Sequence, residues 1–205
     1  MENLFTILSE QFSQLQSLYK WMGEMTNPKR EIFLILRAQS GDREAFDELL
    51  KSIQSALFRY IIRLVGEAAL AEDITQEVFL IIYRKIRWLE NPQLFRAWAY
   101  RIASREAFRR LKREKRWAEQ IRDEEVLEKI SARETAEIYE PELIEKIPTL
   151  ISNVSPASRA VLILHYLDEM SLSEAAEILD ISLGTAKSRL AYGLTSLRQK
   201  IKKEK

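Results

Sequence analysis

Five basic side chains in the middle of the chain are spaced so that a helix would gather them on one side. They lie four, four, three and four residues apart: Arg101, Arg105, Arg109, Lys112 and Arg116. Residues three or four apart are neighbours on a helix surface, and like charges there repel each other. Water makes this repulsion tolerable, whereas facing phosphates turn it into a favourable contact. These residues, called the basic stripe below, therefore predict contact with a nucleic-acid backbone.

A second candidate nucleic-acid contact lies near the C-terminus. The segment Ser171-Leu-Ser-Glu174 is a capping box that begins a short helix, and Asp180-Ile-Ser182 is a predicted turn before a longer helix. This pattern is typical of a helix-turn-helix, whose second helix meets the major groove with its N-terminal turns. Five side chains there are candidate contacts: Thr185, Lys187, Ser188, Arg189 and Tyr192. A plain structural hairpin of two helices is the alternative interpretation.

A polar face of different character is predicted on the helix over about residues 70–87. Four apolar residues are expected on its core side: Ile74, Val78, Ile81 and Ile82. Another side carries carboxylates, an amide and one apolar residue: Asp73, Gln76, Glu77 and Leu80. A solvated acidic face with a helix cap is one interpretation of these residues.

The residue types that enzymes use are scarce. The chain has no cysteine and one histidine, His165, which lies on an apolar helix and is expected to be structural. There is no Gly-rich phosphate loop, metal-ligand cluster or nucleophile elbow. Glu72, Asp73 and Glu77 are the one conceivable metal site, but they lack histidine partners. We therefore predict a protein that is not an enzyme, with no cofactor and no metal.

The elements that position these residues are all expected to be helices, because glycine and proline number only five each and helix formers dominate. Asp42 and Asn91 are predicted caps, and Ser155 caps a helix that starts with Pro156. Phe95 and Trp98 are expected in the core. The predicted helices cover residues 1–25, about 32–39, 43–64, 70–87, 92–117, 156–167, 172–179 and 183–202, with a loop over 88–91.

The charge pattern divides the chain. Ten acidic residues and three basic ones lie between Glu119 and Glu145, where apolar residues are thin. We predict an amphipathic N-terminal extension over 1–28, a first domain over 29–117, an acidic linker over 118–147 and a second domain over 148–205. The extension either packs on its own domain or docks on a partner. No apolar run reaches the length of a membrane span and no secretory signal is recognisable, so a cytoplasmic location is expected.

Segments in both halves resemble one family. The first half contains Gly41-Asp-Arg-Glu-Ala-Phe46, Ala71-Glu-Asp-Ile-Thr-Gln-Glu-Val-Phe79, Phe95-Arg-Ala-Trp98 and Tyr100-Arg-Ile-Ala103. These segments are similar to the second conserved region of bacterial extracytoplasmic-function sigma factors. The second half contains Ser171-Leu-Ser-Glu-Ala-Ala-Glu-Ile-Leu179 and Gly184-Thr-Ala-Lys-Ser-Arg-Leu190. These resemble the fourth conserved region, and their order and separation agree as well.

The resemblance implies roles for the first half. The helix that carries Asp73, Gln76, Glu77 and Leu80 would dock on the clamp helices of the largest subunit of RNA polymerase. The basic stripe would contact phosphates of the −10 promoter element through Arg101, Arg105, Arg109 and Lys112. Trp88 and the loop after it would capture an unstacked base. Closing the domain is the other interpretation of Trp88.

The resemblance also implies roles for the rest of the chain. The −35 element would be met by five side chains: Thr185, Lys187, Ser188, Arg189 and Tyr192. A phosphate contact or a contact within the domain is the other interpretation of Arg189. The acidic linker would enter the RNA channel of the polymerase, with a flexible solvated spacer as the alternative. Two departures from the family pattern occur: Asp180 stands where glycine is usual, and the second turn of the recognition helix, Ala191-Tyr-Gly-Leu194, lacks the usual arginines. The implied partners are core RNA polymerase, through its clamp helices and flap region, promoter DNA and an anti-sigma factor.

The expected function is therefore that of a sigma factor, which binds core RNA polymerase, recognises −10 and −35 elements and promotes melting of the promoter. The alternative is a helix-turn-helix regulator that binds duplex DNA without polymerase. Such a regulator would need a dimer interface and a palindromic site. The N-terminal apolar stripe is the candidate interface.

Overall fold

The structure, a computed structural model, describes residues 28–113, 147–148 and 150–203. Every regular element in this part of the chain is helical, which confirms the predicted all-α class. The expected N-terminal helix, the acidic linker and Arg116 lie outside the described residues. None of the helices within the described ranges combines the length and the apolar character needed to cross a bilayer.

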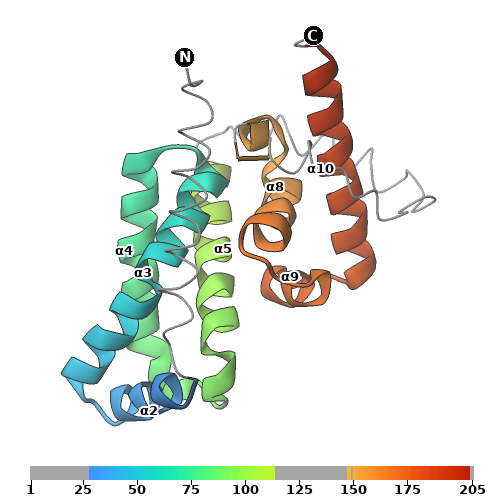
Figure 1. Cartoon of the computed structure of the whole chain (residues 1–205). Coiled ribbons are helices and arrows are strands. Elements are labelled where there is room, and N and C mark those ends of the chain that lie inside the picture. The colour runs from blue at the N-terminus through green and yellow to red at the C-terminus, as the bar shows by residue number, and fades with distance from the viewer. Residues whose placement is uncertain (1–27, 114–146, 149, 204–205) are drawn as a thin grey trace, which may run out of the picture. The chain divides into compact units, whose positions relative to one another are not determined.

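Within residues 28–113 and again within residues 151–203, the helices follow one another with short connections (Figure 1). Their bounds are α2 (Pro28–Gln39), α3 (Arg43–Val65), α4 (Ala68–Lys85), η1 (Ile86–Trp88), η2 (Pro92–Leu94), α5 (Phe95–Arg113), η3 (Ile151–Asn153), α8 (Pro156–Leu162), η4 (Ile163–Leu167), α9 (Leu172–Leu179) and α10 (Leu183–Lys203). The described residues form two compact units, one within residues 28–53 and 86–93 and the other within residues 54–85, 94–113, 147–148 and 150–203.

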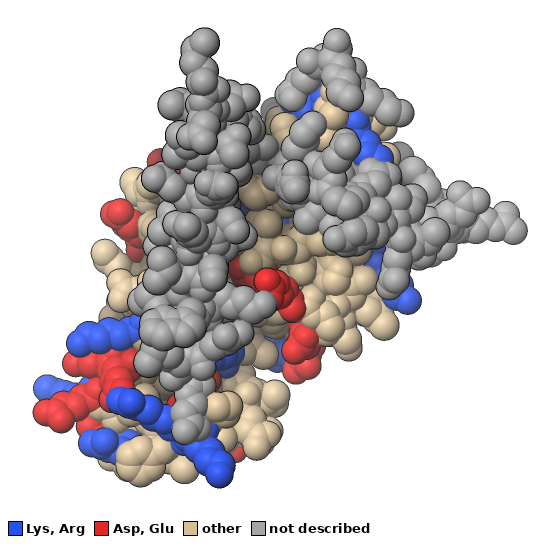
Figure 2. Space-filling model, in the orientation of Figure 1, with Lys and Arg blue, Asp and Glu red and all other residues tan. Residues whose placement is uncertain are grey.

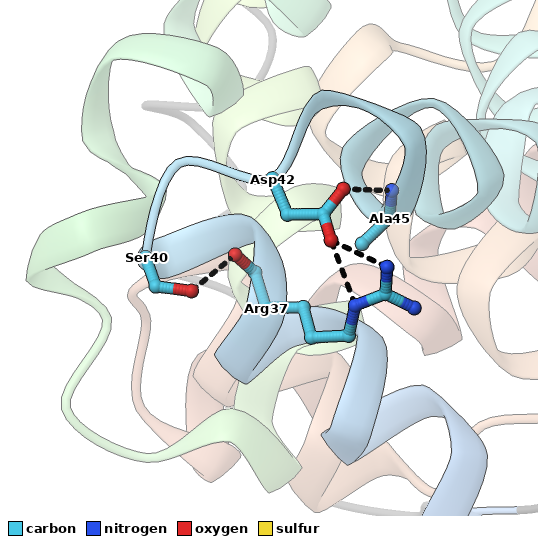
Figure 3. Close-up of polar contacts among 4 residues, drawn as sticks. All are labelled: Arg37, Ser40, Asp42 and Ala45. Atoms are coloured by element: carbon cyan, nitrogen blue, oxygen red, sulfur yellow. Dashed lines mark hydrogen bonds and ion pairs between the residues drawn. The ribbon is translucent and has the colours of Figure 1, made fainter.

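In the first unit, α2 turns sharply into α3 (Figure 3). Asp42 accepts hydrogen bonds from the Ala45 backbone N–H at 3.0 Å and from Arg37 Nε at 2.8 Å, so the predicted cap is confirmed. These two donors lower the pKa of the Asp42 carboxyl, because both stabilise its charged form. Gly41 takes a φ of +96°, which glycine adopts without steric cost.

Two amide hydrogen bonds join α2 to η1 and to the residue that follows η1, within the same unit. Gln39 Nε2 donates to the backbone oxygens of Ile86 at 2.9 Å and Leu89 at 2.7 Å. The surface around α2 mixes basic and acidic side chains (Figure 2). Arg30 and Glu48 form one exposed ion pair there, at 2.5 Å. Charges of both signs side by side give this surface no strong field of one sign.

In the second unit, α4 packs against α5. The core side of α4 is buried at Ile74, Val78 and Ile82 as predicted, whereas Ile81, also expected there, is half-buried. Phe95 is fully buried, and the Trp98 ring, half-buried, lies 6.2 Å from it between centroids. Tyr60 of α3 shares a 2.7 Å hydrogen bond with Ser104 of α5, so this buried hydroxyl is paired.

The same unit contains the helices of the second half, α8, α9 and α10 (orange to red in Figure 1). The capping box is present: the Ser171 hydroxyl accepts from the Glu174 N–H, and the Glu174 carboxylate accepts from the Ser171 N–H. Asp180 takes a left-handed conformation, with φ of 58°. Ser182 then caps α10 by accepting from the Thr185 N–H at 3.0 Å. The predicted helix-turn-helix is therefore confirmed.

Several local predictions need correction. The helix expected from about residue 32 begins earlier, as α2 at Pro28, because proline is favourable in the first turn of a helix. The helix expected from Pro92 begins as α5 at Phe95, because residues 92–94 form a tighter 3-10 turn that Asn91 caps through the Gln93 N–H. Ser155 holds the cap position of α8, but its side chain makes no cap hydrogen bond, and Pro156 in the first turn has no N–H to offer. The α-helix expected through Leu167 widens into the π-helical turn η4 from Ile163.

Candidate nucleic-acid interface and docking face

The basic stripe lies on α5, opposite the side by which this helix is buried. Alanines and a leucine at four-residue spacing face the core: Ala99, Ala103, Ala107 and Leu111. This leaves Arg105, Arg109 and Lys112 exposed, with Arg101 half-buried. The predicted residues of the −10 contact that lie on α5 thus share one side of one helix, as their spacing requires.

Three arginines of the stripe have acidic or carbonyl partners. Arg109 pairs with Glu106 one turn earlier on the same helix. Arg101 donates to the backbone oxygen of Glu177 in α9 at 2.9 Å and lies 3.5 Å from the carboxylate of that residue. Arg105 donates to the carboxylate of Asp180, at the end of α9, at 3.1 Å.

The first turns of α10 carry the predicted major-groove contacts. Lys187 is exposed, whereas Thr185, Ser188, Arg189 and Tyr192 are half-buried. The Thr185 hydroxyl shares a 2.9 Å hydrogen bond with Ser182, and Ser188 donates to the Gly184 carbonyl at 3.0 Å. Both hydroxyls are therefore engaged by the helix start itself. Among the predicted contacts, Lys187 is the most open to an approaching phosphate or base edge.

The predicted docking face on α4 is open to solvent. Asp73, Gln76 and Leu80 are exposed and Glu77 is half-buried. Tyr83, one helical turn beyond Leu80, is 55% exposed and extends this face with an aromatic ring. Tyr83 was not among the predicted residues, although its spacing of three residues from Leu80 is the signal that could have found it.

Trp88 belongs to the first unit, where it ends η1. Its ring is 67% exposed, and the Arg87 guanidinium lies 5.9 Å from the ring centroid. A side chain so open buries little apolar area, which weakens the interpretation that it closes the domain. An exposed indole is available for stacking on a base.

Two buried charges were not predicted from the sequence. Arg159 of α8 donates to the backbone oxygens of Leu64 at 2.7 Å, Ser152 at 2.7 Å and Val154 at 2.8 Å. Burial lowers the pKa of this guanidinium to about 10, because the interior disfavours its charge. Asp168 lies 3.6 Å from Arg63 of α3, and burial still raises the pKa of this carboxyl to about 6. The hydrophobic periodicity of the sequence could not predict the burial of either charge, because their partners Leu64 and Arg63 lie far away in sequence.

Together, these features define a class: an all-helical protein with a helix-turn-helix and a separate helix bearing a stripe of arginines. Two family models match the chain, sigma-70 region 2 over residues 49–117 and sigma-70 region 4 over residues 144–197, and together they cover more than half of it.

Known proteins agree with these matches. The chain is 29% identical over 179 residues to the ECF RNA polymerase sigma factor SigW of Bacillus subtilis, covering 82% of this chain and 95% of that one. It is 27% identical to the RNA polymerase sigma-H factor of Pseudomonas aeruginosa, covering 81% and 91%. The fold resembles CnrH, solved in complex with the cytosolic domain of CnrY, with a TM-score of 0.62, 21% identity and coverage of 86% and 99%. This chain belongs to the extracytoplasmic-function sigma factors of the sigma-70 family.

Proposed function

We propose that this chain binds core RNA polymerase, recognises the −10 and −35 elements of its promoters and promotes melting of the DNA. The observation that carries the proposal is the presence, in one chain and in the right order, of a region 2 match bearing the basic stripe and a region 4 match bearing the helix-turn-helix. Residues 29–117 and 148–205 would act as two domains on one promoter.

The α4 face is the proposed contact for the clamp helices of the polymerase. Its carboxylates, Asp73 and Glu77, offer charge to a basic surface, while Leu80 at 49% exposure offers apolar area to bury. Apolar area surrounded by polar groups is the usual composition of a protein interface. Tyr83, also exposed, adds to the apolar area of Leu80 beside these carboxylates, and this combination supports docking.

The basic stripe is the proposed contact for the −10 element. Phosphate contacts of this kind position the DNA without reading its sequence. Trp88 would supply the stacking surface for an unstacked base. On α10, Lys187 and Arg189 would contact the −35 element with Thr185, Ser188 and Tyr192 around them.

An anti-sigma factor is a further proposed partner. One of the similar solved structures is the sigma factor RpoE of Bartonella quintana in complex with the anti-sigma factor NepR, at a TM-score of 0.56 and 24% identity, covering 77% of this chain and 96% of that one. Such a partner would compete with polymerase for the free chain.

Run-off transcription tests the proposal. Purified chain and core polymerase are combined on pooled genomic fragments, with core polymerase alone as the control. We expect discrete transcripts that appear only when the chain is present and that map to a shared upstream sequence. No transcript from any template would overturn the proposal. If the chain binds duplex DNA but never co-purifies with core polymerase, it is a polymerase-independent helix-turn-helix regulator instead.

A further inference from the structure

The basic stripe and the end of α9 are in contact within the second unit, and this contact bears on DNA binding. Arg101 and Arg105 reach α9 from α5, at 2.9 Å and 3.1 Å. Their partners are the carbonyl of Glu177 and the carboxylate of Asp180. Both partners are oxygen acceptors with negative charge or partial charge, as phosphate oxygens are. The arginines proposed to hold the −10 phosphates are therefore already occupied.

The end of α9 is well suited to imitate a phosphate. The last carbonyls of a helix lack intrahelical partners and carry the negative end of the helix dipole. The Glu177 carbonyl belongs to this last turn of α9, where it accepts a weak 3.3 Å hydrogen bond from the Asp180 N–H in addition to the one from Arg101. The carboxylate of the same residue lies 3.5 Å from Arg101. Negative charge from the backbone and from a side chain thus converges on one guanidinium.

Asp180 adds the second contact from a backbone position that favours glycine. Its φ of 58° is left-handed, a conformation that glycine adopts at no cost and aspartate only with some strain. A glycine there would make the turn at least as well, but it would have no carboxylate to offer Arg105. The turn does not require a carboxylate at this position, whereas the ion pair with Arg105 does.

Buried contacts join other helices of the same unit. Arg159 of α8 donates to the Leu64 carbonyl of α3 at 2.7 Å. Asp168, after η4, lies 3.6 Å from Arg63 of α3, and both side chains are largely buried. Buried charged groups are costly to leave unpaired. The α5–α9 contact thus lies beside buried contacts that also join residues of the first and second halves of the chain.

We propose that the end of α9 is an internal competitor of promoter DNA: in the free chain, Glu177 and Asp180 occupy Arg101 and Arg105, and DNA must displace them. The proposal rests on the proposed role of the stripe in binding the −10 element. Each guanidinium can face α9 or a phosphate. The α5–α9 contact therefore weakens DNA binding, and DNA binding weakens the α5–α9 contact to the same extent. Exposed ion pairs are individually weak, so the contact remains reversible.

The test compares two variants of the full chain that remove the same charge. Glu177→Gln with Asp180→Asn removes the competing carboxylates, and asparagine keeps the tolerance of Asp180 for left-handed geometry. Asp47→Asn with Glu72→Gln is the matched control, on exposed acids of α3 and α4. The probe is a fluorescein-labelled single-stranded oligodeoxythymidylate of about 12 nucleotides at low salt, followed by anisotropy. We expect the α9 variant to bind about three- to tenfold more tightly than the wild type, and the control to change less than about twofold.

Equal affinities of the two variants would overturn the competitor role. Arg101→Ala with Arg105→Ala separates this failure from failure of the proposed function. If that variant binds the oligonucleotide as tightly as the wild type, the stripe does not contact DNA. If it binds more weakly while the α9 variant matches its control, the stripe contacts DNA and only the competition is wrong.

Energy transfer gives a second readout that does not depend on affinity. The chain has no cysteine, so dyes can be confined to Lys85→Cys on α4 and Ser173→Cys on α9. We expect saturating oligonucleotide to lower the transfer efficiency of the otherwise unaltered chain. The Glu177→Gln and Asp180→Asn changes should lower it before any DNA is added. Transfer that stays constant under both treatments would overturn the proposal.

Discussion

Gly193 is a single residue that lets α10 lie close against α8. A Cβ atom at this position would lie 2.7 Å from Leu162 Cδ1 and 3.1 Å from Leu162 Cγ, and Leu162 is fully buried. The leucine cannot move into solvent, so neighbouring helices would have to shift. The glycine is needed for close packing, although it weakens the helix locally.

We therefore expect Gly193→Ala to lower the free energy of unfolding by about 1–3 kcal/mol, the usual cost of overpacking a core. Gly184→Ala is the matched control on the same helix, where the nearest atom to the added Cβ is Ser182 Oγ at 3.7 Å. It should be neutral or stabilising, because alanine is the better helix former. Urea unfolding measures both. Equal effects of the two changes would contradict the packing argument.

Asp168 predicts a pH dependence of stability. Its pKa is about 6 in the folded chain, against an ordinary value of 3.8, because burial outweighs the favourable charges of Arg63 and Arg59 and the hydrogen bond from Tyr100. Between these values the folded chain binds the proton and the unfolded chain does not. Raising the pH through this window therefore lowers stability, by roughly 2–3 kcal/mol in total.

The measurement is urea unfolding from about pH 4 to pH 7 for the wild type and for Asp168→Asn, whose amide does not titrate. We expect the difference in unfolding free energy between them to fall as the pH rises from about 4 to about 6, and then to level off. A difference that stays flat across this range would mean that Asp168 keeps an ordinary pKa.

Among the helices, α9 depends on its capping box to begin at the right residue. Ser171 and Glu174 exchange hydrogen bonds that pair two otherwise unsatisfied N–H groups. We expect Ser171→Ala to cost about 1 kcal/mol, while Ser173→Ala, an exposed position two residues later, should have little effect. Thermal unfolding compares the two variants. Similar losses would show that the cap contributes nothing specific.

The exposed face of α4 carries a prediction about binding rather than stability. Asp73→Arg with Glu77→Arg reverses the charge of the proposed polymerase contact while leaving the buried side, at Ile74 and Val78, unchanged. Like charges across an interface repel, so we expect co-purification with core polymerase to be lost while the helical circular dichroism persists. Glu44→Arg with Asp47→Arg, exposed acids of α3, is the control. Retained binding would place the polymerase contact on another face.

For the whole molecule, the prediction concerns how salt weakens DNA binding. Removing one phosphate-binding side chain should flatten the log–log dependence of affinity on salt by about one unit, or about 0.7 for a single strand. We expect this from Arg105→Ala and Arg109→Ala, measured by anisotropy over a series of salt concentrations. Arg43→Ala, an exposed arginine of α3 outside the stripe, is the control. Unchanged slopes would remove the stripe from the DNA interface.

The helices and most of their caps could be predicted because they depend on residues close in sequence. Asp42 bonds to Ala45, and Ser182 to Thr185, each three positions along the chain. Helical periodicity likewise needs only a few turns to become visible, as on the buried side of α4. The family resemblance, which the matches to regions 2 and 4 confirm, also rests on such short segments.

The order of residues was enough to predict an all-helical chain, a helix-turn-helix and the side of α5 on which the arginines lie. What those arginines face became visible only in the folded chain, since Arg101 and Arg105 meet α9 across 76 and 75 residues. The folded chain was likewise needed to see that Arg159 and Asp168 are buried and that position 193 requires a small residue. Such contacts depend on how helices pack, and no local spacing encodes the pairing of helices that lie far apart along the chain.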